Sequence, residues 1–116
     1  MTQSLAEWKG FANSTEFRAG HAKVLEVVRD TRAASLILDN RRLEGVTPPD
    51  QLWIRDTFAK SMEAAGLRRL ALVVAHHGLA RIAIEEIRTQ TAKSAIVTRT
   101  FGTVSEAIEW VGASAE

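Results

Sequence analysis

Apolar residues along the chain cluster into short runs that predict four strands. Residues 35–39, SLILD, are continuously apolar up to the aspartate, which is typical of a strand buried on both faces. Residues 69–75, within LRRLALVVA, and residues 94–101, SAIVTRTF, predict two further strands. Residues 4–9, SLAEWK, alternate in polarity and predict a short first strand that ends at Gly10.

A helical period separates the first two strands. Its apolar face is made by Phe17, His21, Val24, Leu25 and Val28. Asn13 with Glu16 three residues later has the spacing of a capping box, so we expect a helix that extends to about Thr31. On this face, His21 is expected to be a partly buried and hydrogen-bonded histidine rather than a ligand.

The second helix is predicted to begin at the segment TPPDQLW. Thr47 and Asp50 have capping spacing, Pro48 takes the first helical position, and Gly66 ends the helix. Its expected buried face consists of Ile54, Thr57, Phe58, Met62 and Ala65. A third helix is predicted over residues 79–90, and a last one over residues 104–111, capped by Thr103 with Glu106 and packed through Val104, Ala107, Ile108 and Val111.

Strands that alternate with helices predict an α/β fold. We expect residues 1–116 to form one domain with a mixed, mostly parallel sheet of four or five strands and about four helices. Ligands of such sheets bind at the carboxyl ends of the strands. The segments after residues 39, 75 and 101 are therefore the first places to look for a site.

Composition excludes several classes of function. The formal net charge of +1, from 15 basic and 14 acidic residues, argues against a nucleic-acid partner, and the lack of cysteine excludes disulfides and thiol chemistry. No apolar run reaches the ~20 residues of a membrane helix, and the N-terminus does not resemble a signal peptide, so we expect a cytoplasmic protein without a transmembrane segment. Phosphate-binding and dinucleotide-binding glycine motifs and the nucleophile elbow are missing, and we expect no required cofactor.

Asp39, His76 and His77 form the first candidate site. Asp39 ends the second strand and the histidines follow the third, so an acid and an imidazole could meet at one edge of the sheet for acid/base chemistry or as two metal ligands. A zinc site usually needs a third ligand, however, and adjacent residues leaving a strand point to opposite sides. The favoured interpretation is that Asp39 accepts backbone N–H groups in its turn and that the histidines are structural.

Arg41, Arg42, Thr47 and Trp53 lie around the following loop. The two arginines could hold a carboxylate or phosphate, or could pair with Glu44 or Asp50 in a solvated loop, which is favoured. Thr47 at a helix start is a possible phosphorylation site because the helix dipole favours negative charge, although a purely capping role is favoured. Trp53 lies beside the apolar face and could line a groove between layers.

The chain resembles the SpoIIAA-like, or STAS/SEC14-type, small bacterial domains over nearly its whole length. The resemblance is carried by the D-N-R-R turn in LILDNRRL, by TPPDQLWIRDTF and by the ending RTFGTVSEAIEWV. It implies a four- or five-stranded mixed sheet with helices mainly on one face, and a non-enzymatic domain that binds proteins, nucleotides or lipids. Phosphorylation in this family points to Thr47, but the two prolines that follow it depart from the family pattern, as does the lack of an opening β-hairpin, which makes dimerisation more plausible.

The sequence therefore favours a non-enzymatic, STAS-like regulatory or interaction module that binds a protein partner or a small apolar or anionic ligand. Recognition is expected between Asp39 and Trp53, with Arg41 and Arg42 supplying charge and Trp53 and Phe58 supplying apolar contact. Two alternatives remain open: a small enzyme that uses Asp39 with His76 or His77, and a structural homodimer.

Overall fold

The computed structural model describes residues 3–7, 14–41, 47–75 and 95–113. The strands are β1 (Gln3–Glu7), β2 (Ser35–Asp39), β3 (Arg69–Val73) and β4 (Val97–Phe101). The helices are α1 (Ser14–Thr31), α2 (Pro48–Trp53), the π-helical turn η1 (Ile54–Phe58), α3 (Ala59–Ala64) and α5 (Val104–Ala113). The predicted helix over residues 79–90 and the predicted cap Asn13 lie outside the described residues.

The four strands form one sheet in the order β1-β2-β3-β4, and each neighbouring pair is parallel. In this register Ile37 of the central strand β2 lies between Leu5 and Ala71. The predicted α/β class and the parallel pairing are confirmed, while the antiparallel pairing that a mixed sheet requires does not occur among the described strands. All five residues of β2 are buried, as its continuous apolar run predicts.

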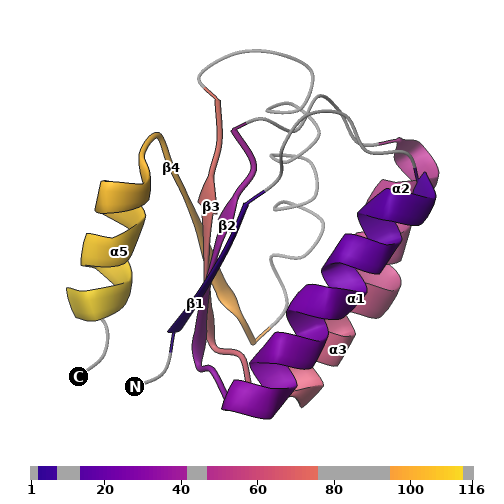
Figure 1. Ribbon diagram of the computed structural model, residues 1–116, viewed down its shortest axis with the longest axis horizontal. Helices are drawn as coiled ribbons and strands as arrows, with labels where there is room; N and C mark the ends of the chain where they lie inside the picture. Colours follow the sequence, from indigo (N-terminus) through magenta and orange to yellow (C-terminus); the bar gives the residue numbers. More distant parts are fainter. Residues whose placement is uncertain (1–2, 8–13, 42–46, 76–94, 114–116) are drawn as a thin grey trace.

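Helices cover both faces of the sheet. Figure 1 shows α1 and α3 side by side on one face, with α5 on the other. The connections from β1 to β2 and from β2 to β3 step in the same direction along the sheet, so a common handedness places α1 and the α2–α3 segment on the same face. After β4 the chain turns back, and α5 packs against β2, β3 and β4 on the opposite face.

The core is divided by the sheet into two clusters. Even-numbered residues of β2 and β3, such as Leu36 and Leu72, pack with the residues of α1, η1 and α3, including Phe17, Phe58 and Met62. Odd-numbered residues face α5 instead, and this smaller cluster consists of Ile37, Ala71, Val73, Ala107 and Val111. The alternation follows from the two-residue period of strand side chains.

The second helix differs from the prediction at Thr57, which is exposed rather than buried. The reason is the π-helical turn, in which the N–H of Ala59 donates to the carbonyl of Ile54, five residues earlier. In an α-helix, each residue is rotated around the helix axis by about 40° relative to the residue four positions earlier. The wider π turn offsets this rotation and keeps one row buried, namely Asp50, Ile54, Phe58 and Met62.

The predicted helix ends are largely confirmed. Gly66 has a positive φ of 100°, and the N–H of the next residue, Leu67, donates to the carbonyl of Met62 at 3.0 Å, as in a glycine-terminated helix. At the start of α5, Thr103 accepts from the N–H of Glu106 at 3.2 Å. Ile108 was expected on the buried face of this helix, but it is an exposed apolar residue.

Candidate functional site

A polar cluster lies at the carboxyl end of β2, made of Asp39, Asn40 and Arg41. The side chain of Asp39 is buried, with the residue 2% exposed, and both carboxylate oxygens accept from Arg41: Oδ1 from Nε at 2.9 Å and Oδ2 from Nη2 at 2.6 Å. Oδ1 also accepts the backbone N–H of Arg41 at 3.2 Å. The charge of a carboxylate at the end of a central strand is therefore compensated within three residues of sequence.

This arrangement confirms the expected turn role of Asp39, because the carboxylate accepts a backbone N–H two residues ahead. The ion pair with Asp39 was not predicted. Arg41 was expected to pair with Glu44 or Asp50, and since Glu44 lies outside the described residues, that pairing stays a prediction. Arg42, His76 and His77 lie outside the described residues, so the meeting of Asp39 with a histidine stays a prediction.

Asn40 is the residue of this cluster that sequence reasoning missed. Its backbone N–H donates to the carbonyl of Val73 at 2.8 Å, which continues the pairing of β2 with β3 by one residue. The residue is 6% exposed, and its side-chain Oδ1 has no hydrogen-bond partner among the described residues. The available signal was its position: a polar residue directly after a strand that is buried on both faces is itself expected to be buried.

A second polar group lies at the start of α2. Thr47 is the N-cap, its Oγ1 accepts the N–H of Asp50 at 3.4 Å, and it donates to Asp50 Oδ2 at 3.1 Å. Asp50 is 3% exposed, and its Oδ1 accepts from Nε of Arg18 at 3.0 Å, which joins α1 to α2. The predicted cap is confirmed, and phosphorylation of the exposed Thr47 stays a prediction.

An aromatic cluster packs beneath this ion pair. His21 is buried, with ring centroids 4.3 Å from Phe17, 5.8 Å from Trp53 and 4.7 Å from Phe58, and its Nδ1 is 2.8 Å from the carbonyl oxygen of Phe17. Since that oxygen can only accept, Nδ1 carries a proton. Burial lowers the pKa of His21 to about 4, against the opposing effects of this hydrogen bond and the charge of Asp50. His21 is therefore an uncharged, hydrogen-bonded residue of the core, and it was expected to be structural.

The structure separates residues that the sequence placed in one recognition surface. Asp39 follows Ile37 by two residues and so lies on the α5 face, whereas Trp53 and Phe58 belong to the core on the α1 face. Phe58 is buried there, and Trp53 is covered in part by Arg18, whose guanidinium lies 5.6 Å from the ring centroid. Neither ring adjoins Asp39 across the sheet, and Phe58 is closed to a partner at the surface.

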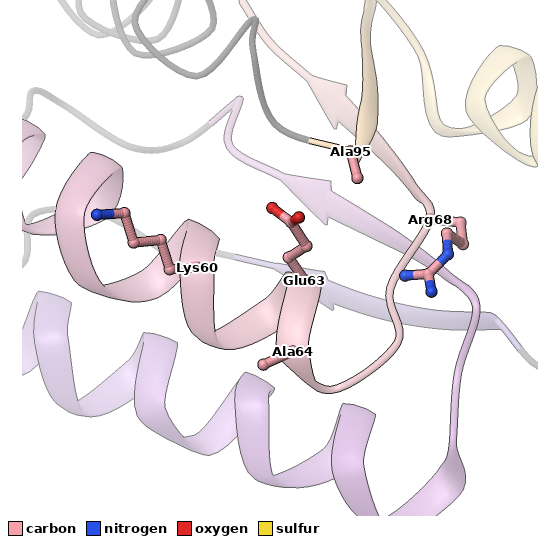
Figure 2. Close-up of a pocket in the computed structure, with 5 residues that line it drawn as sticks. All are labelled: Lys60, Glu63, Ala64, Arg68 and Ala95. Atoms are coloured by element: carbon pink, nitrogen blue, oxygen red, sulfur yellow. The ribbon is translucent and has the colours of Figure 1, made fainter.

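A shallow hollow of about 620 Å³ opens at the opposite edge of the sheet, near the amino ends of β3 and β4. Figure 2 shows its lining: Lys60, Glu63 and Ala64 from α3, Arg68 from the segment before β3, and Ala95. Arg68 Nη1 donates to the carbonyl of Leu67 at 3.0 Å. The hollow is wide open and its lysine and arginine are exposed, so it lacks the buried polar contacts of a built site.

Further observations bear on the class of protein. Among the described residues, no three side chains of the histidine, cysteine, aspartate or glutamate types are grouped so that they could hold a metal ion. None of the described helices combines the length and the apolar character that crossing a membrane requires. The fold and the polar cluster define an α/β protein with a parallel sheet and a polar carboxyl edge. Comparison of the chain with protein-family models, curated proteins and solved structures gave no match.

Proposed function

We propose that this chain is a non-enzymatic binding module of the STAS-like type, which recognises a small ligand or a protein partner at the carboxyl edge of its sheet. The observation that carries the proposal is the polar cluster at the carboxyl end of β2, in which Asn40 is 94% buried and its amide oxygen has no partner among the described residues. Natural proteins seldom leave such groups unpaired unless they have a role. The position agrees with the rule that parallel sheets bind ligands at their carboxyl edge.

The state of Asp39 supports binding over acid/base catalysis. Both of its carboxylate oxygens accept from the guanidinium of Arg41, at 2.9 and 2.6 Å. A general base needs an oxygen within reach of a substrate proton, and the ion pair opposes such a proton transfer because the charged form is already stabilised. The enzyme alternative, with His76 or His77 as partner of Asp39, therefore requires the Arg41 pair to open.

Native mass spectrometry of the purified protein, under gentle and then denaturing conditions, tests the proposal. We expect a fraction of the wild-type protein to carry a non-covalent molecule or a protein partner that is lost on denaturation. Asn40→Leu should carry less of it, whereas Gln51→Leu, which alters an amide on α2, should carry as much as the wild type.

Equal loads on all three proteins would refute a site at Asn40. The same spectra decide the remaining alternatives: a clean, unliganded dimer would favour the structural homodimer, and an added phosphate would be assigned to Thr47 or to another residue by peptide mapping. Turnover of a substrate that is lost in His76→Ala or His77→Ala would favour the enzyme.

A further inference from the structure

The buried amide of Asn40 is held in place by the sheet. Its backbone N–H donates to the carbonyl of Val73 at the end of β3, and the N–H of Val74 donates in turn to the carbonyl of Phe101 at the end of β4, at 2.9 Å. The backbone of Asn40 is therefore fixed by the end of the β2–β3 pairing. Its Oδ1 is an acceptor that no described residue satisfies, and an unpaired buried acceptor is a persistent cost to the folded state.

Among the residues that the structure describes, the neighbours of Asn40 in the sequence carry no net charge. The carboxylate of Asp39 and the guanidinium of Arg41 neutralise each other through two hydrogen bonds. The residues bonded along the same edge are apolar: Val73 and Val74 are buried, and Phe101 is partly buried. A charged group brought to Asn40 would lose its hydration without a free countercharge among these residues, which is costly.

We infer that the ligand of this edge is an uncharged molecule with an apolar body, which donates an N–H or O–H hydrogen bond to Oδ1 of Asn40. The inference rests on the proposed function and narrows the class of ligand. The sequence allowed an apolar or an anionic ligand, and the inference keeps the apolar ligand, adds a neutral hydrogen-bond donor and excludes the anion. A neutral donor satisfies the amide oxygen and leaves the Asp39–Arg41 pair intact. An anion would instead compete with Asp39 for Arg41.

The test uses matched probes and the amide signals of Asn40 and Arg41 in a nitrogen–proton correlation spectrum. The donors are 1-octanol and indole. Their controls, 1-methoxyheptane and 1-methylindole, keep the apolar body and lack the donor, and octanoate and inorganic phosphate represent anions. We expect each donor to bind at least about ten times more tightly than its control, since one lost hydrogen bond to a buried group is worth about that factor.

Two variants separate binding from folding. Asn40→Leu should abolish the preference for donors over their controls and raise the urea midpoint, because a buried group without a partner is replaced by an apolar one. If Asn40→Leu does not fold, the binding experiment uses Asn40→Ser, which introduces a smaller side chain. Gln51→Leu should bind all probes like the wild type.

Tighter binding of octanoate or phosphate at Asn40 and Arg41, lost in Arg41→Met, would overturn the neutral-ligand inference and leave the proposed function standing. The inference also fails if no probe shifts the Asn40 signals, or if donors and controls bind equally. The proposed function is then decided separately, by whether wild-type protein loses its load in Asn40→Leu under native mass spectrometry.

Discussion

Asp39 and Asp50 are both buried carboxylates, and each is paired with an arginine side chain that is about half exposed. They differ in where the partner comes from. Asp39 is held by Arg41, two residues along the chain, and Asp50 by Arg18, thirty-two residues away on another helix. The first pair closes a turn, whereas the second fixes the position of α1 against α2. The same chemistry therefore serves local shape in one place and tertiary packing in the other.

The neighbours of the two carboxylates also differ. Asp50 accepts from Thr47 and lies above a packed aromatic cluster that includes His21 and Trp53. Asp39 ends a strand next to Asn40, whose amide oxygen is unpaired. The Asp50 group is thus a hydrogen-bonded network that stabilises the fold, whereas next to Asp39 the acceptor of Asn40 is unmet among the described residues, at the sheet edge where we propose that a ligand binds. Substitutions around Asp50 should therefore mainly change stability, and substitutions around Asp39 and Asn40 should mainly change binding.

The largest effect is expected from acid, on the Asp50 side of the molecule. The folded protein keeps His21 neutral down to about pH 4, whereas the unfolded chain takes up the proton near pH 6.5. The unfolded state therefore binds more protons between these values, and stability is full above pH 6.5 and is lost as the pH falls toward 4. The fall amounts to about 3 kcal/mol.

Urea unfolding at intervals between pH 4 and 7 measures this fall. His21→Leu should flatten the profile whatever its stability at neutral pH, because the titrating group is gone. The matched control is a His76→Gln, His77→Gln double variant, which should keep the wild-type slope. An unchanged slope in His21→Leu would show that other groups cause the acid sensitivity.

Loss of the tertiary ion pair is expected to have the next largest effect. Arg18→Met leaves the buried carboxylate of Asp50 without its arginine and should lower the free energy of unfolding by about 2 kcal/mol, less than for a fully buried pair because Arg18 is 44% exposed. Arg55→Met breaks a pair between adjacent exposed residues, Arg55 and Asp56, and should leave the urea midpoint unchanged. Equal effects of the two variants would contradict a special role for Arg18.

These contrasts show what the sequence could and could not reveal. The two-residue and helical periods located every described strand and helix, and the cap at Thr47 followed from spacing to Asp50. The burial of Thr57 was predicted wrongly because a π turn changes the period within a helix, and local sequence carries little signal for it. The order of the strands and the α5 face depend on packing between distant segments.

The candidate site was predictable only in part, for the same reason. The D-N-R-R turn marked the carboxyl end of β2, because the end of a buried strand can be read from one segment. Pairing of Arg18 with Asp50 joins residues thirty-two apart, and no local pattern indicates it. Asp39 and Trp53 were grouped from the sequence, but by strand alternation Asp39 lies on the face of Ile37 while Trp53 packs on the other face, which depends on the packing of α2 and cannot be read from one segment.

Two similar helix caps differ in the burial of the acidic side chain that accepts from the capping threonine. Thr47 and Thr103 each accept an N–H three residues ahead and donate to the acid there, but Asp50 is buried and Glu106 is exposed. Thr47→Ala should cost about 1 kcal/mol, and Thr103→Ala about 0.5 kcal/mol. Urea midpoints of the two variants measure the difference. A larger loss in Thr103→Ala would mean that burial of the acid does not strengthen the cap.

The smallest effect is expected at the local ion pair. Arg41→Lys keeps the charge but cannot reproduce the two parallel hydrogen bonds to Asp39, and the free energy of unfolding should fall by about 0.5 kcal/mol. Amide hydrogen exchange then tests how far along the chain each substitution acts. Arg41→Lys should speed exchange at the end of β2 alone, whereas Arg18→Met should speed it along α1 as well. Faster exchange in α1 of Arg41→Lys would show that the turn after β2 is coupled to helix packing, and the division between a local and a tertiary carboxylate would no longer hold.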